Sequence, residues 1–153
     1  MSDNISDNSN DEPITEILVN ECYGGFGVSN KAIDLYNKYK LEINPDFNPI
    51  KHYECLESIK DRSDPILIKV FDELGNEFND KYSKAGKVSI KQKYIKHCCI
   101  REYDGKEYID INYFKYKTDK LKEILYSENM DEIEKIKNMK ILFETEKLSD
   151  FFW

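Results

Sequence analysis

The sequence predicts an α+β protein with one small antiparallel sheet, helices packed on one face of that sheet and a C-terminal helical extension. Three observations predict this fold class. The run Ile14–Asn20 is rich in β-branched residues, and Asp104-Gly105 separates two alternating segments as the turn of a β-hairpin does. Between them, Asp64-Pro65 is a helix start signal, because a capping carboxylate precedes proline at the first helical position.

The N-terminal half begins with an expected strand over residues 14–20. A glycine-rich turn stops this strand, and Ser29 fits the N-cap of a helix over residues 30–39. Residues 41–62 give no clear pattern, since two prolines interrupt them early and the helical spacing that follows is weak.

The next helix begins at the Asp64-Pro65 signal and ends at Gly75, where a left-handed residue is favoured. Its expected inward stripe consists of Ile68, Phe71 and Leu74. A further strand is expected over residues 87–91.

The hairpin is expected over residues 94–112, and a two-residue turn at Asp104-Gly105 fixes its register by pairing Tyr103 with Lys106. This register places four apolar residues on one face, namely Cys98, Ile100, Ile109 and Ile111. Glu102 and Glu107 then oppose each other beside the turn, which is unfavourable unless a cation lies near, and we expect them to be solvated.

Two helices are expected after the hairpin. The first covers residues 118–126, and Asn129 with Glu132 has the spacing of a capping box for the second, which runs to Phe143. The inward stripe of this last helix is expected to hold Ile133, Ile136 and either Met139 or Lys140. Three regions follow from the whole pattern: a disordered tail (1–13), an α+β core (14–113) and a helical extension (114–153).

Composition narrows the classes of function. The chain has 153 residues and a formal net charge of −7, which disfavours binding to nucleic acid. No apolar run approaches the roughly 18 residues that span a bilayer, and the polar N-terminus does not resemble a targeting peptide. We therefore expect a soluble intracellular protein with no membrane contact, and reduced thiols at its four cysteines.

The segment from Asn20 to Ser29 is the most unusual one, because it joins a strand to a helix through three glycines. The backbone of Gly24, Gly25 and Gly27 beside a helix N-terminus could hold a phosphate or carboxylate, with Cys22, Tyr23, Phe26 and Ser29 around it. Arg62 is the candidate to complete such a site, since guanidinium matches phosphate geometry. The spacing fits neither a P-loop nor a dinucleotide fingerprint, so a tight structural turn is the competing interpretation.

Several motifs resemble those of a family of small uncharacterised proteins of tailed phages and giant amoebal viruses. They are Cys22-Tyr-Gly-Gly-Phe-Gly27, Arg62-x-Asp64-Pro65, Val70-x-x-x-Leu74-Gly75 and Glu102-Tyr-Asp-Gly105, and they span residues 16–113 in the family's order. The chain departs from the family pattern after Gly75. The resemblance implies a viral context, in the cytoplasm of an infected host cell or in the virion, and carries no assigned activity.

Catalytic and metal-binding interpretations have few residues to draw on. Cys22 could act as a nucleophile only with a histidine base, and the chain has two histidines. A zinc site could be assembled only from His52, Cys55, His97 and Cys99, a split set with a weak signal. We therefore expect no metal or cofactor, and no catalytic residue is assigned.

The function that the sequence favours is a non-catalytic binding module that engages a host or virion protein, because many of its 11 tyrosines and eight phenylalanines must lie outside the core. The alternative is a protein that binds or processes a nucleotide-like anion at the Gly24–Ser29 turn. A lysine-rich stretch over residues 81–96 is interpreted as a solvated strand edge rather than a nucleic-acid site.

Overall fold

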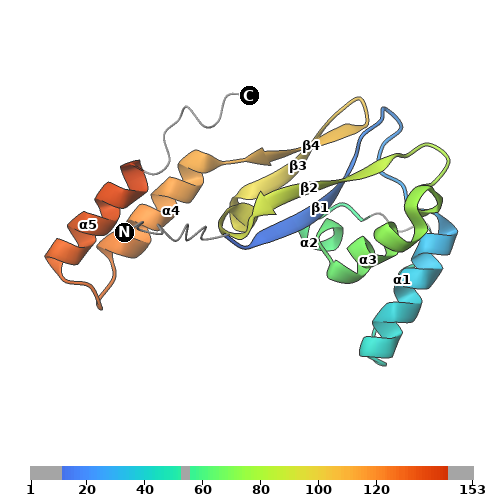
Figure 1. Ribbon diagram of the computed structural model, residues 1–153, viewed down its shortest axis with the longest axis horizontal. Helices are drawn as coiled ribbons and strands as arrows, with labels where there is room; N and C mark the ends of the chain where they lie inside the picture. Colours follow the sequence, from blue (N-terminus) through green and yellow to red (C-terminus); the bar gives the residue numbers. More distant parts are fainter. Residues whose placement is uncertain (1–11, 53–55, 145–153) are drawn as a thin grey trace, which may run out of the picture. The chain divides into compact units, whose positions relative to one another are not determined.

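The computed structural model describes residues 12–52 and 56–144. The chain divides into two compact units, residues 1–110 and residues 111–153, so the division lies three residues before the predicted boundary at 113. The fold is α+β, as predicted (Figure 1).

The elements follow one another as β1 (Ile14–Asn20), α1 (Asn30–Ile43), α2 (Ile59–Arg62), α3 (Pro65–Leu74), the 3₁₀ turn η1 (Gly75–Phe78), β2 (Ala85–Lys91), the 3₁₀ turn η2 (Gln92–His97), β3 (Cys98–Tyr103), β4 (Lys106–Ile111), α4 (Tyr113–Leu125) and α5 (Glu132–Glu144).

The strands form two antiparallel pairs rather than the one sheet that the sequence predicts. β1 pairs with β2, with Ile14 opposite Lys91 and Asn20 opposite Ala85. β3 pairs with β4. β1 is buried from Ile17 to Asn20, so the second half of this strand contributes to the core that the helices cover.

Helices α1 and α3 begin where the sequence predicts. Ser29 caps α1 by accepting a hydrogen bond from the amide of Ala32, although the helix continues four residues beyond residue 39. Asp64 caps α3 through the amide of Ile66, and Gly75 ends it with a positive φ of 54°.

The hydrophobic core lies between the β1–β2 pair and these helices. Its buried members are Leu18, Ala32, Tyr36, Leu67, Val70, Phe78 and Ala85. The predicted inward stripe of α3 is therefore wrong in detail, because Leu67 and Val70 are the buried residues. Ile68, Phe71 and Leu74 only flank the core, since this helix is apolar on most of its circumference.

The hairpin turn has the predicted geometry, with positive φ at both Asp104 (51°) and Gly105 (84°), as a two-residue primed turn requires. Side-chain burial alternates along both strands as the predicted register requires. Ile100 and Ile109, on the apolar face, are half-buried, whereas Arg101 and Tyr108, on the other face, are exposed. The hairpin is shorter than predicted, because residues 94–97 belong to η2, a turn that buries Tyr94.

The end of the predicted disordered tail is ordered, and residues 1–11 lie outside the described residues. Glu12 forms ion pairs with Lys91 and Lys93. The hydrogen bonds from these two lysines lower the pKa of the Glu12 carboxyl, and the bond from Lys91 has the larger effect. The carbonyl of Pro13 accepts a hydrogen bond from the amide of Gln92. The backbone contact between β1 and β2 thus continues by one hydrogen bond beyond Ile14, and the Glu12 ion pairs add side-chain contacts beside it.

The second unit is a pair of helices. α4 begins five residues earlier than predicted because Asn112 caps it through the amide of Lys115. α5 is capped by Asp131, not Asn129, through the amide of Glu134. The predicted inward stripe of α5 is wrong at two positions, because Ile133 (80% exposed) and Ile136 (62% exposed) point to solvent, whereas Met139 is half-buried.

Candidate functional site

Three loops meet where β1 ends opposite the start of β2. They are the glycine turn (residues 20–27), the loop that precedes β2 (79–84) and the hairpin turn (103–106), and we call this assembly the loop end. Close backbone approach demands its glycines: a Cβ on Gly24 would lie 1.6 Å from the Tyr82 carbonyl oxygen, and one on Gly105 would lie 2.6 Å from the Gly25 amide nitrogen.

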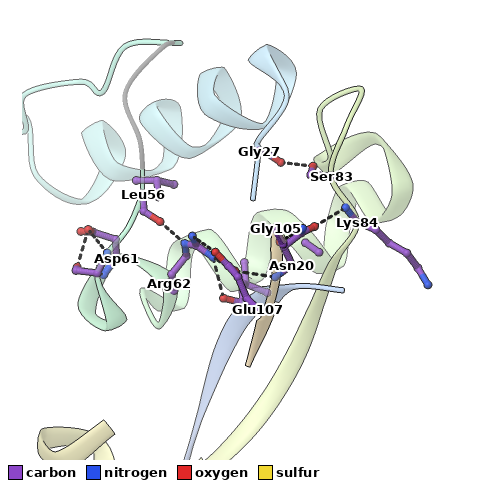
Figure 2. Close-up of polar contacts among 12 residues, drawn as sticks. Asn20, Gly27, Leu56, Asp61, Arg62, Ser83, Lys84, Gly105 and Glu107 are labelled. Atoms are coloured by element: carbon purple, nitrogen blue, oxygen red, sulfur yellow. Dashed lines mark hydrogen bonds and ion pairs between the residues drawn. The ribbon is translucent and has the colours of Figure 1, made fainter. Parts of the chain in front are cut away.

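The buried side chain of Asn20 ties the three loops together (Figure 2). Its Nδ2 donates to the carbonyl of Cys22 at 2.6 Å and to that of Gly105 at 2.7 Å. Its Oδ1 accepts from the amide of Lys84 at 2.9 Å. One amide group thus holds each loop by a backbone group, which fixes their mutual position.

A buried ion pair anchors the hairpin to the rest of the first unit. The guanidinium of Arg62, at the end of α2, donates two hydrogen bonds to the carboxylate of Glu107 on β4 (Figure 2). One joins NH1 to Oε2 at 2.8 Å and the other joins NH2 to Oε1 at 3.1 Å. The two side chains are 4% and 9% exposed. Glu107 Oε2 also accepts from the backbone amide of Asn20 at 2.8 Å, so the ion pair and the loop network are continuous.

Arg62 has further partners. Its guanidinium donates to the carbonyl of Leu18 at 3.3 Å and to the carbonyl of Leu56, and its Cζ lies 3.3 Å from the centre of the Phe26 ring. The structure therefore brings together two of the predicted site residues, Phe26 and Arg62. It places the guanidinium among groups of the protein itself.

Ser29 and Gly27, two residues of the predicted anion cradle, have contacts within the protein. Ser29 Oγ donates to the carbonyl of Glu77 at 2.6 Å while it caps α1. A Cβ on Gly27 would lie 1.8 Å from the Asp80 carboxylate, so an acidic group adjoins the turn. Arg62 does not pair with the nearby Asp64, which accepts from Lys40 and Tyr36; it donates to backbone carbonyls instead.

The sequence pattern does not reveal the two residues that organise this region. Glu107 is buried rather than solvated as the pattern predicts, and nothing in the pattern assigns a role to Asn20. The predicted hairpin register does place Glu107 on the face of Ile109, which is the available signal for its burial. Asn20 carries no such signal, since its side-chain partners Lys84 and Gly105 are 64 and 85 residues away in sequence.

Each loop of the loop end presents one exposed tyrosine. Tyr23 is 68% exposed, Tyr82 is 64% exposed and Tyr103 is 77% exposed. Tyr23 is among the predicted site residues; Tyr82 and Tyr103 are not. Their backbones belong to loops that contact one another, so the three exposed tyrosines stand on loops that the Asn20 hydrogen bonds hold together.

Residues 12–52 and 56–144 place no general base at Cys22 and assemble no metal centre. The Sγ of Cys22 contacts the carbonyl oxygen of Tyr82 at 3.3 Å and the amide oxygen of Asn20 at 3.4 Å, and neither is a general base. The described part of the chain holds no group of three or more His, Cys, Asp or Glu side chains placed to bind a metal ion.

The four residues of the weak zinc alternative are accounted for as follows. His52 Nε2 lies 2.7 Å from Asp34 Oδ1, and Cys55 lies outside the described residues. His97 ends η2, while Cys99 is an exposed free thiol on β3. None of the helices described is both long and apolar enough to traverse a bilayer.

No protein-family model, curated protein or solved structure matches this chain. Its function is therefore argued from the geometry of the loop end.

Proposed function

We propose that this protein is a non-catalytic binding module that engages another protein through the loop end. One observation carries the proposal: Tyr23, Tyr82 and Tyr103 are all more than 60% exposed and each comes from a different one of the three loops that Asn20 ties together. Isolated exposed aromatic residues are ordinary, but three on adjoining loops that are held together favour a protein-binding role, because tyrosine is enriched at protein interfaces.

Tyrosine suits such a surface for physical reasons. It buries a large area on binding while only two side-chain torsions lose freedom, and its hydroxyl tolerates a polar environment. The loops beneath are already held by the Asn20 hydrogen bonds and by the bond from Ser83 Oγ to the Gly27 carbonyl. Binding then costs little ordering of the backbone, which favours affinity.

The expected partner follows from the family resemblance of the glycine turn. In that context the protein is a viral accessory protein, and the loop end engages a host or virion protein. The acidic net charge of −7 supports a protein partner over nucleic acid.

The experiment removes the tyrosines and keeps the scaffold. The triple variant Tyr23→Ser, Tyr82→Ser, Tyr103→Ser should fold as the wild type does, because all three side chains are exposed. A matched control replaces Tyr108 and Tyr126 with serine in the same way. These tyrosines are 54% and 81% exposed but lie outside the loop end.

All proteins are used as bait in extract of the cells in which the chain is naturally made, and captured proteins are quantified by mass spectrometry. We expect at least one protein that binds the wild type and the control variant and is lost from the triple variant by about tenfold or more, since tyrosines at the centre of an interface often each contribute over 1 kcal/mol. If every captured protein binds all three baits equally, the loop end is not the binding surface.

A further inference from the structure

A cavity of about 320 Å³ adjoins the loop end, and its lining residues come from three separate parts of the first unit. Phe26 belongs to the glycine turn, Leu56, Glu57 and Arg62 come from the segment that ends with α2, and Ile100, Glu102 and Glu107 come from the hairpin. Its volume is within the range of ligand sites in proteins. Phe26 belongs to one loop of the loop end and Glu102 directly precedes another, so the cavity adjoins the loop end.

The floor of the cavity is fixed before any ligand arrives. Arg62 is 3% exposed, and its guanidinium is held by both oxygens of Glu107 and by two backbone carbonyls. Phe26 stacks over this guanidinium. The half-buried side chains of Leu56 and Ile100 complete the apolar part of the wall.

The charge of the cavity is negative. The positive charge of Arg62 is matched by Glu107, which leaves the carboxylates of Glu57 and Glu102 uncompensated. Both are exposed, and within the described ranges no ion pair involves either of them. A ligand that places an apolar chain on Phe26, Leu56 and Ile100 would therefore meet a lining that also holds two exposed carboxylates, and an anion would be repelled.

We propose that this cavity binds an aliphatic chain that ends in a cation, namely a lysine or arginine side chain of the protein that the loop end engages. The inference rests on the proposed function and adds the chemistry of one partner residue. The stem of the ligand packs on the apolar wall, and its ammonium or guanidinium group pairs with Glu57 and Glu102.

The test needs no knowledge of the partner. N-acetyl-arginine methylamide and N-acetyl-lysine methylamide are titrated into the full chain, and the NMR signals of the Ile100 methyl groups and the Phe26 ring are followed. N-acetyl-norleucine methylamide supplies the same stem without charge, and N-acetyl-glutamate methylamide supplies the opposite charge. We expect saturable shifts with the two cationic probes at millimolar concentrations, about three- to tenfold tighter than with norleucine, and no saturable shift with glutamate.

Substitutions of Glu57 and Glu102 test whether these two carboxylates bind the cationic group of the probe. The double variant Glu57→Gln, Glu102→Gln should bring the affinity for arginine down to that for norleucine. The control Glu42→Gln, Asp46→Asn changes the net charge equally at exposed positions outside the cavity, and should bind arginine as the wild type does.

Three results would overturn the inference: equal affinity for norleucine and arginine, arginine binding that survives in the double glutamine variant, or no saturable shift with either cationic probe. The tyrosine variant of the loop end should keep the cavity intact, so it should bind arginine normally. A failure of this titration with a positive capture experiment would remove the cavity ligand and leave the protein-binding function standing.

Discussion

Replacing Arg62 with methionine should destabilise the first unit severely, because this residue joins three segments at once. Methionine keeps an unbranched side chain of similar length but has neither the charge nor any of the five N–H donors. The substitution removes two hydrogen bonds to Glu107, those to the carbonyls of Leu18 and Leu56, and the stacking on Phe26.

The magnitude follows from what is left behind. Glu107, only 9% exposed, would keep one donor, the amide of Asn20, and would hold a negative charge with no cation beside it. Removing one member of a buried ion pair costs about 3–5 kcal/mol, whereas the intact pair contributes much less than that to net stability. A domain is stable by about 5–15 kcal/mol in total, so a large part of that stability would be lost.

A double-mutant cycle separates the two effects. Urea unfolding of Arg62→Met, Glu107→Leu and the combined variant, followed by far-ultraviolet circular dichroism, should show that the combined variant is more stable than the sum of the two single losses predicts, by about 2 kcal/mol or more. The reasoning is refuted if Arg62→Met costs less than about 1 kcal/mol, or if the two single losses simply add.

Three further expectations can be checked with the same methods. Ile109→Asp should cost about 2 kcal/mol because it puts a charge on the half-buried face of the hairpin, while Asp110→Ile on the exposed face should cost under about 0.5 kcal/mol; equal thermal midpoints would contradict the assigned faces. Burial alone would raise the pKa of Asp64, but hydrogen bonds, first the one from Lys40, lower this pKa below its usual value. The ionised carboxylate therefore stabilises the fold above about pH 4, and this contribution is lost as the pH falls through the lowered pKa. The stability difference between wild type and Asp64→Asn should therefore shrink on acidification, and a difference that grows instead would show the opposite sign of coupling. Nucleotides and phosphate at millimolar concentrations should leave the thermal midpoint unchanged, since the Ser29 hydroxyl and the Arg62 guanidinium are already bonded within the protein, whereas a saturable rise would restore the anion hypothesis.

The features that the sequence predicts correctly are those that local chemistry decides. Ser29 and Asp64 cap helices because each bonds an amide two or three residues ahead. Asp104-Gly105 turns the hairpin because both residues tolerate positive φ. None of these depends on a distant part of the chain, so pattern and position suffice to predict them.

The features that the sequence hides depend on distant partners. Whether Tyr94 continues a strand or turns inward is decided by the space it fills, and η2 buries it. Helix α5 is another case: Ile133 and Met139 fit one expected stripe, yet Ile133 is exposed and Met139 is half-buried. The sequence likewise does not show that Tyr23, Tyr82 and Tyr103 stand on loops that contact one another, because those contacts join distant parts of the chain.

The buried ion pair shows where the sequence holds more information than its motifs reveal. The expected hairpin sets Glu107 opposite Glu102, an arrangement that requires a nearby cation. The chain has 23 basic residues, of which only Arg62 and Arg101 are arginines. A lysine could offer Glu107 a charge, but its single ammonium could not also reach both carboxylate oxygens, the carbonyls of Leu18 and Leu56 and the face of Phe26. A carboxylate on the apolar face of a hairpin needs a cation with several donors, and an arginine, which is rare in this chain, supplies one. Both residues can be identified in the sequence. What the fold adds is the 2.8 Å contact that joins them, and with it the base on which the loop end stands.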